Sequence, residues 1–266
     1  MKGFDKEYVK RAFSSSAKTY DTHAALQLEA ARELAEYIPK GLKPQSVVDA
    51  GCGTGFLTGL LLERFPQAEI FCFDIALPMV ERVRERFKRR VIFFNADCEA
   101  LPLESKGFDL VASNLTYQWM PEPLSAFREV ARVLKEGGYF VFSTLGSATF
   151  EELKTSVEKA MAIAGRDGLP PFMEFREVKE IEYMLERAGF REVRIKRRLK
   201  VKSYQSLWQF LKTLKHTGAT NPHRKGSRSL SRGTLLKEVE KVYQREYPSD
   251  RGIRASYDLI YVVARK

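Results

Sequence analysis

The chain has 266 residues, of which 44% are apolar and 30% charged, and a formal net charge of +11. This length is enough to bury a large core as one elaborated domain or as a domain with an insert. No stretch approaches the roughly 18 apolar residues of a membrane span, and the first residues lack the apolar segment of a secretory signal, so we expect a soluble, cytoplasmic protein.

Residues 1–45 predict a helical cap at the amino end of the chain. They read as two helices that flank a break at Ser14–Ser16, because apolar residues recur at helical spacing after the break. Proline and glycine residues between positions 39 and 44 end the second helix before the first strand.

Residues 46–146 alternate between strand patterns and helix patterns. Apolar runs of strand length, such as SVVDA, EIFCFD and FDLVASN, are separated by stretches of helix length. Strands that are apolar throughout and alternate with helices indicate a parallel sheet covered on both faces. The predicted fold is therefore a doubly wound, Rossmann-like α/β domain with a mostly parallel sheet.

The pattern changes in the last third of the chain. Residues 147–192 predict an inserted helical segment that ends in a sixth helix. Residues 193–266 contain two strands of high β-propensity, VRIKRRLKVKSY and YDLIYVVARK, with a basic helical lid inserted at about 204–250.

A strongly basic window runs from Arg191 to Arg232. It holds 13 Lys and Arg against a single acid, Glu192, for a net charge of +12, whereas the rest of the chain carries −1. One basic face on a nearly neutral body favours a specific acidic partner over general adhesion. A solvated surface strand and helix remains the alternative interpretation.

A glycine-rich turn, GCGTG, lies between the first predicted strand and its helix. Gly51 and Gly53 let the backbone approach a ligand closely there. A dinucleotide pattern needs Gly or Ala at position 56, which is Phe56 in this chain. Asp49 precedes the turn, where its charge opposes a pyrophosphate but suits an ammonium group. The turn therefore favours S-adenosylmethionine over a nicotinamide cofactor.

Two further carboxylates end predicted strands. Asp74 is placed to accept hydrogen bonds from both ribose hydroxyls, and Asp97 can accept one from an adenine amino group. Each carboxylate alone also suits a helix N-cap. The carboxyl ends of parallel strands meet at the edge where open α/β sheets bind ligands, so three carboxylates at this edge favour an adenosyl site.

The segments VVDAGCGTGF, FDIALPMVERVRE, NADCEALPL and FDLVASNLTYQWMPEP resemble successive motifs of class I S-adenosylmethionine-dependent methyltransferases. The resemblance implies a seven-stranded sheet. It places Asp49 and the glycines at the methionyl group, Asp74 at the ribose and Asp97 at the adenine. It also implies three apolar wall residues and an amide beside the methionyl group, namely Ile75, Met79, Cys98 and Asn114.

A narrower resemblance covers nearly the whole chain. RAFSSSAKTYDTHAALQ, SNLTYQWM, LKHTGATN and SYDLIYVVARK are similar, in order, to the malonyl-[acyl-carrier protein] O-methyltransferase family of biotin synthesis. This implies methylation of the free carboxylate of a malonyl thioester, which initiates pimeloyl and biotin synthesis. The implied partner is an acidic acyl-carrier protein bearing malonyl-phosphopantetheine, or malonyl-coenzyme A, and the basic window suits either.

A carboxylate acceptor is ionised at neutral pH, so no general base is required and the enzyme has to position and desolvate the reactants. We expect positioning by Tyr20, Gln118 and Trp119, with Tyr20 as a lid over the sulfonium or, alternatively, a core aromatic. The candidates for binding the substrate are Gln118, Trp119, Lys215, Asn221 and Arg224.

Three cysteines without a C-x-x-C pair and three scattered histidines predict free thiols and no metal. Other functions fit the same cofactor: methylation of a free, aconitate-like acid, methylation of RNA or tRNA, and non-catalytic binding by a regulator. We expect neither nucleic acid nor membrane as a partner, because no RNA-binding module is present and aromatics are sparse in the basic strand. An intact cofactor motif disfavours the regulator, and no pattern indicates the oligomeric state.

Overall fold

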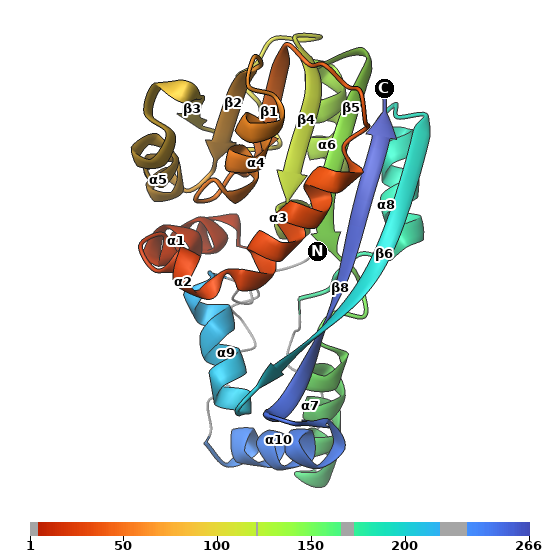
Figure 1. The fold of residues 1–266 in the computed structure, drawn as a ribbon. Coiled ribbons are helices and arrows are strands. Elements are labelled where there is room, and N and C mark those ends of the chain that lie inside the picture. Colours follow the sequence, from red (N-terminus) through yellow and green to blue (C-terminus); the bar gives the residue numbers. More distant parts are fainter. Residues whose placement is uncertain (1–4, 121, 166–172, 219–232) are drawn as a thin grey trace.

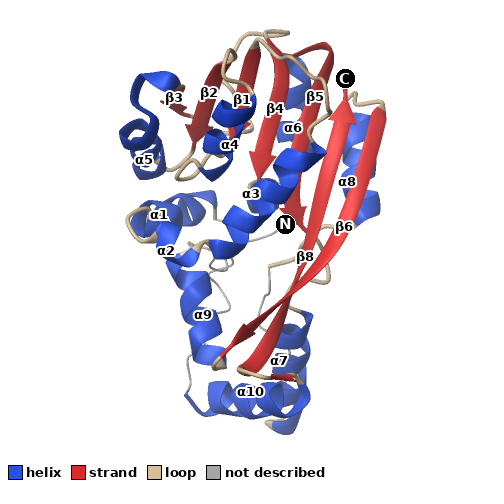
Figure 2. Ribbon diagram, in the orientation of Figure 1, coloured by secondary structure: helices blue, strands red, loops and turns tan. Residues whose placement is uncertain are grey.

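One twisted sheet organises the computed structural model, which describes residues 5–120, 122–165, 173–218 and 233–266 (Figures 1 and 2). Its strands are β1 (Ser46–Ala50), β2 (Glu69–Asp74), β3 (Ile92–Asn95), β4 (Phe108–Asn114), β5 (Leu134–Leu145), β6 (Glu192–Tyr204), β7 (Pro248–Ser249) and β8 (Gly252–Arg265). The α-helices are α1 (Lys6–Ser16), α2 (Tyr20–His23), α3 (Ala25–Tyr37), α4 (Phe56–Arg64), α5 (Leu77–Phe87), α6 (Pro123–Val133), α7 (Glu151–Ile163), α8 (Val178–Arg187), α9 (Leu207–His216) and α10 (Gly233–Glu246). Short 3₁₀ turns occur at η1 (Lys88–Arg90) and η2 (Tyr117–Trp119). None of the described helices has the length and apolar character to cross a membrane.

The strand order is β3-β2-β1-β4-β5-β8-β6, and β7 adds a two-residue pairing to β8. The first five strands in this order run parallel, whereas β8 is antiparallel to both β5 and β6. The predicted mostly parallel sheet of seven principal strands is therefore confirmed, and β7 is a small addition. The chain winds outward from β1 to β3 and then continues at β4 on the other side of β1. Such a switch point is where open α/β sheets bind ligands.

Helices cover both faces of the sheet because each presents an apolar stripe to it. On one face α3 and α4 contribute Leu34 and Leu61, which are fully buried. On the other face α6 and α8 contribute Phe127 and Leu185. The sheet is thus shielded from water on both sides, which explains its continuous apolar strands.

The amino-terminal cap departs from its predicted outline. Ser14–Ser16 form the last turn of α1 rather than a break, and the hydroxyls of Ser14 and Ser16 donate to the carbonyls of Lys10 and Phe13. Such bonds to the preceding turn let serine remain helical. The chain turns after Ser16 instead, and the short α2 follows before α3.

The strands β6 and β8 are the long arms of the sheet. They continue past the ends of the parallel strands, with α7 and α10 packed together at their far end (Figure 1). The helix α9 lies on the other side of these arms and contacts α2. Ser206 caps α9 by accepting from the backbone N–H of Gln209. The amino-terminal helices, the long strands β6 and β8, and the helix α9 therefore enclose the space below the parallel strands.

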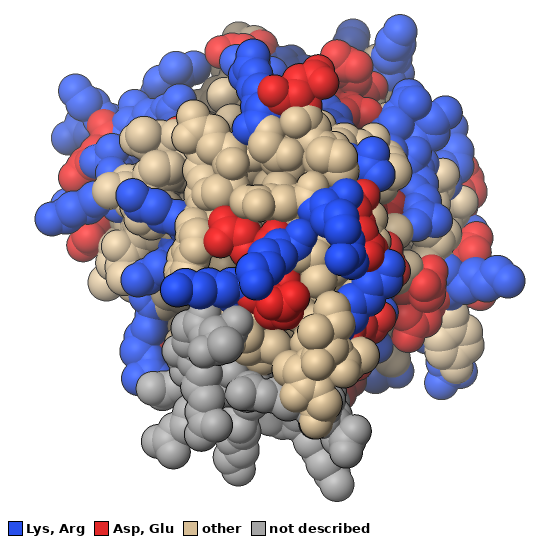
Figure 3. Space-filling view, turned by 90° about the horizontal axis from the view of Figure 1, so that it is seen from below, with Lys and Arg blue, Asp and Glu red and all other residues tan. Residues whose placement is uncertain are grey.

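Several basic residues of β6, part of the predicted basic face, have acidic partners on another helix. Lys200 and Lys202 both pair with Glu29 of α3, and Arg198 pairs with Glu33. Acidic residues also lie among the Lys and Arg side chains on the face that carries α7, α9 and α10 (Figure 3). A charge count along the chain cannot reveal such partners on another helix. Within α9, Lys212 is exposed and has no ion-pair partner in the described part of the chain.

An ion pair between the half-exposed Arg197 and the buried Asp258 joins β6 to β8. Asp258 is 1% exposed and accepts from Nε of Arg197 at 2.6 Å, from Nη2 of Arg197 at 2.8 Å and from the backbone of Ala148 at 3.3 Å. Asp258→Ala is expected to lower the free energy of unfolding by about 2 kcal/mol, since these donors lose their acceptor. Urea denaturation measures this change. The exposed control Asp250→Ala should shift stability by less than about 0.5 kcal/mol, and an equally small shift for Asp258→Ala would contradict the assignment.

Candidate functional site

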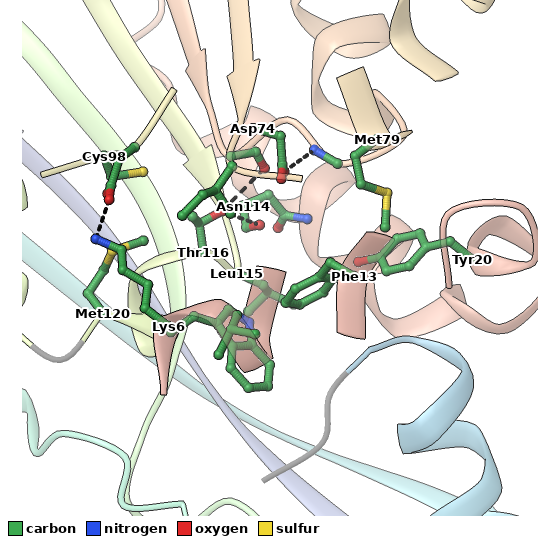
Figure 4. A pocket seen from close by; sticks show the side chains of 16 residues that line it. Lys6, Phe13, Tyr20, Asp74, Met79, Cys98, Asn114, Leu115, Thr116 and Met120 are labelled. Atoms are coloured by element: carbon green, nitrogen blue, oxygen red, sulfur yellow. Dashed lines mark hydrogen bonds and ion pairs between the residues drawn. The ribbon is translucent and has the colours of Figure 1, made fainter. Parts of the chain in front are cut away.

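A cavity lies at the carboxyl ends of β1, β2 and β4, at the switch point of the sheet. Nine of the residues predicted to bind the cofactor line it: Tyr20, Gly51, Gly53, Asp74, Ile75, Met79, Asp97, Cys98 and Asn114. Figure 4 shows Asp74 and Asn114 on one side of this cavity, and Phe13 and Tyr20 of the amino-terminal helices across from them. Side chains from strand ends that are far apart in sequence thus converge on one space.

Asp74 fixes the glycine turn to the end of β2. One carboxylate oxygen accepts from the backbone N–H of Gly53 at 3.0 Å, and the other accepts from that of Ala76 at 2.8 Å. Burial raises the pKa of Asp74 to about 6, although these backbone donors act in the opposite direction. Each oxygen keeps a free lone pair, so the carboxylate retains the capacity to accept from two hydroxyl groups.

Asp49, the tenth predicted residue, lines a smaller hollow that shares Tyr20, Gly51, Gly53 and Asn114 with the main cavity. Its side chain is fully buried, and one oxygen accepts from the hydroxyl of Thr58 at 2.6 Å. The other oxygen has no hydrogen-bond partner. Burial raises the pKa of Asp49 to about 7. An unpartnered buried carboxylate oxygen fits a ligand that brings an ammonium group.

The glycine turn has the shape that a closely approaching ligand requires. Gly51 has a φ of 68°, and a Cβ atom there would lie 2.3 Å from the side chain of Thr116. Gly53 has a φ of 54°, and a Cβ atom there would meet no atom within 4 Å. A side chain at Gly51 is therefore excluded by Thr116 of the protein itself, whereas the absence of a side chain at Gly53 leaves open space at the cavity wall. With Asp49 and Asp74, this turn fits the methionyl and ribose groups of S-adenosylmethionine.

No pattern in the sequence pointed to Lys6, which reaches the site from α1. Its ammonium pairs with both Asp97 and Glu99. Burial lowers the pKa of Lys6, but the bonds to Asp97 and Glu99 outweigh it and raise that pKa overall. Asp97 lines the cavity as predicted, and it also anchors the amino-terminal cap.

A second cavity of about 500 Å³ adjoins the first and is enclosed by the cap, α9 and the arms of the sheet. Four of the predicted residues line it: Tyr20, Gln118, Trp119 and Lys215. Two others, Asn221 and Arg224, lie outside the described residues. Most of the wall is apolar, and its charged members in the described part of the chain are the cations Lys202 and Lys215.

Two of the residues predicted for positioning separate the cavities. Tyr20 and Trp119 line both of them, and Trp119 packs edge-on against Phe13 at 5.4 Å between ring centroids. Burial, with Asp74 and Asp21 nearby, raises the pKa of Tyr20, so its phenol stays protonated. These aromatic side chains form the boundary across which a group would pass from one cavity to the other.

Gln118 is held by the protein. Its Nε2 donates to the carbonyl of Leu115 at 2.8 Å, and its Oε1 accepts from Thr144 at 3.2 Å. The sequence identified Gln118 as a polar residue next to the site. It could not reveal that both ends of the amide already have partners.

A histidine pair links the cap to α9 at the second cavity. Nε2 of His23 lies 2.8 Å from Nδ1 of His216, so one ring donates and the other accepts. Partial burial, His23 and nearby lysines lower the pKa of His216, which keeps its ring neutral at pH 7. His23 lines the cavity, so an imidazole ring from the amino-terminal helices forms part of its wall.

Known proteins are similar to this chain in sequence or in fold. Residues 48–142 match the family model described as a methyltransferase domain. The chain is 34% identical to a malonyl-[acyl-carrier protein] O-methyltransferase of Geobacter sulfurreducens, over 98% of this chain and 99% of that protein. A protein of the same name from Acetivibrio thermocellus is 34% identical, over 98% of this chain and 94% of its own length. The crystal structure of YcgJ from Bacillus subtilis superposes with a TM-score of 0.62 at 17% identity, over 90% of this chain and 98% of that one, which concerns the fold alone.

The strand order of the sheet, the cavity at its switch point and the match to the methyltransferase domain lead to one class of protein. The chain is a class I methyltransferase, whose cofactor is S-adenosylmethionine. Identity above 30% over nearly the full length of the relatives narrows the class further. The chain belongs to the malonyl-[acyl-carrier protein] O-methyltransferase family.

Proposed function

We propose that this enzyme methylates the free carboxylate of a malonyl thioester, carried by an acyl-carrier protein, and so starts biotin synthesis. The observation that carries the proposal is the second cavity. Its described lining includes Lys202 and Lys215 and no Asp or Glu, so it suits an anionic acceptor. Its volume of about 500 Å³ has room for the thioester arm as well as for the malonyl group. A free small acid would fill only part of it.

We assign the first cavity and the hollow beside Asp49 to the cofactor. Asp49 would hold its ammonium group, Asp74 its ribose and Asp97 its adenine. Ile75, Met79 and Cys98 would contact the base from apolar walls. S-adenosylmethionine supplies an electrophilic methyl group on a sulfonium. The chain itself binds the two reactants, orients them and excludes water from them.

The reaction requires no general base, because a carboxylate is ionised at neutral pH. Tyr20 and Trp119 would exclude water from the boundary between the cavities and align the acceptor oxygen with the methyl group. Positioning of this kind contributes roughly 7–11 kcal/mol to lowering a barrier. Lys202 and Lys215 would attract the anionic substrate, while Lys202 stays paired with Glu29.

An intact-mass assay tests the proposed reaction. The enzyme and S-adenosylmethionine are incubated in parallel with malonyl-carrier protein, malonyl-coenzyme A, free aconitate and bulk tRNA. We expect one methyl group on the malonyl carrier and none on aconitate or tRNA. Methylation of aconitate or tRNA alone would overturn the proposal and leave the methyltransferase fold intact.

Contact with the carrier protein should depend on α9. Lys212 is exposed there, near the exposed Trp208. Lys212→Glu is expected to lower kcat/KM for malonyl-carrier protein by about tenfold and to change that for malonyl-coenzyme A by less than about threefold, since a reversed charge repels an acidic partner. Lys43→Glu is the matched control, because Lys43 is exposed before β1, at the opposite edge of the sheet. Equal losses with both substrates would place the carrier on another surface.

A further inference from the structure

Carboxamide side chains reach the two cavities at three positions in the described part of the chain: Gln27, Asn114 and Gln118. Gln118 is bonded at both ends, as described above. Asn114 donates from Nδ2 to the backbone carbonyl of Gln27 at 3.0 Å and accepts at Oδ1 from Ser143 at 2.8 Å. The side chain of Gln27 has no hydrogen-bond partner among the described residues. It is therefore the carboxamide with free donors.

Gln27 also occupies a particular place. It lines the hollow that contains Asp49 and the large acceptor cavity, and among the described residues it shares this property with Tyr20 alone. Its backbone is held in place by the hydrogen bond from Asn114, which ties the first turn of α3 to the end of β4. A half-buried amide is thus held at the boundary that the methyl group has to cross.

We propose that the Gln27 carboxamide positions the acceptor carboxylate. Its N–H donates to one carboxylate oxygen and leaves the other free to face the methyl group. This inference rests on the proposed function. A lone pair of the free oxygen forms the new bond to the methyl carbon while the bond from that carbon to sulfur breaks, and its electron pair stays on sulfur. No proton moves, so a donor that holds its own proton is sufficient.

A neutral donor suits this step better than a cation. The carboxylate loses its charge as the ester forms, so a full positive charge would stabilise the bound substrate more than the transition state. The two lysines of the cavity fit a different task. Lys202 is paired with Glu29, and Lys215 is exposed, so both act through attraction at longer range.

Gln27→Glu tests the assignment with almost no change in shape. It places a negative charge beside the substrate carboxylate, and kcat/KM for malonyl-coenzyme A should fall by about 100-fold, since juxtaposed like charges cost several kcal/mol. The dissociation constant for S-adenosylmethionine, measured by calorimetry, should not rise by more than about threefold, because Gln27 also lines the hollow beside Asp49 and an added carboxylate there does not repel the cationic cofactor. Binding of the methyl ester product should also change by less than about threefold, because the ester carries no charge on that group.

Gln45→Glu is the matched control, because Gln45 is exposed before β1 and lines none of these cavities. It should behave as the unmodified enzyme. Wild-type turnover by Gln27→Glu would overturn the inference and leave the proposed function standing. An equal loss of affinity for substrate and methyl ester would also overturn it, since that pattern reflects packing rather than charge. An unmodified enzyme that fails to methylate malonyl-coenzyme A and malonyl-carrier protein would overturn both.

Discussion

Replacing Asp49 by asparagine is expected to weaken S-adenosylmethionine binding by about 100-fold or more while the protein remains folded. The buried oxygen without a partner in Asp49 is the group that would meet the ammonium of the cofactor. Asparagine keeps the shape and the contact with Thr58 but removes the charge. Calorimetric titration with S-adenosylmethionine measures the loss, and an unchanged dissociation constant would contradict the assignment.

The raised pKa of Asp49 also predicts how the affinity for the cofactor depends on pH. Its pKa of about 7 means that the free enzyme holds a proton there in mildly acidic solution. Binding of an ammonium group requires the ionised form, so affinity should rise as the pH increases from about 6 to about 8 and then level off. Titrations across this range measure the slope. In Asp49→Asn the slope near pH 7 should disappear, and a wild-type slope in the variant would assign it to another group.

The raised pKa of Asp49 also predicts how the stability of the cofactor-free enzyme depends on pH. This contribution to stability should fall as the pH rises, whereas the affinity for the cofactor should increase. The pKa of Asp49 is higher in the folded state than in the unfolded state, where it lies near 4. The contribution of this carboxyl to stability is therefore fully present below about pH 4 and is lost as the pH rises to about 7. Asp49→Asn should not melt at a lower temperature than the unmodified enzyme at pH 7, and this separates weaker binding from unfolding.

Replacing Tyr20 by alanine is expected to lower kcat by about 100-fold, because water would reach the boundary and the reacting groups would lose their alignment. Tyr20 lines both cavities and the hollow beside Asp49, so its ring separates all three. Tyr20→Phe retains the ring and should stay within about tenfold of the unmodified enzyme. Single-turnover kinetics measure the transfer step directly.

Tyr183→Ala is the control for this substitution, since Tyr183 is 61% exposed on α8 and should tolerate alanine without loss of activity. Full activity of Tyr20→Ala would restrict Tyr20 to packing. A loss in Tyr20→Phe as large as that in Tyr20→Ala would assign the role to the hydroxyl group instead of the ring.

The predictable part of the site consists of residues that follow strands. Asp49, Asp74 and Asn114 could be placed from the sequence because parallel strands end at one edge, and each residue is the last or the next-to-last of its own strand. The parallel core was predictable for a related reason, since its alternation of strand and helix is a local pattern. Local patterns need no knowledge of which distant segments meet.

The remainder of the site depends on contacts between distant segments. Lys6 and Gln27 reach the cavities because the amino-terminal cap folds across the carboxyl edge of the sheet, and no local pattern specifies that docking. The partners of the basic strand β6 were hidden for the same reason, since Glu29 and Glu33 lie on α3. Charge along a chain is visible in a sequence, but neutralisation between segments is a property of the fold.

The two cavities draw their walls from different parts of the chain. The cofactor side is built chiefly on the ends of β1, β2 and β4, whereas the acceptor side takes most of its wall from the cap, α9 and the long arms of β6 and β8. Substitutions in the cap and the arms can therefore alter the acceptor while the methyl donor is retained. One catalytic core of this kind can be adapted to new acceptors by exchanging the segments that surround it.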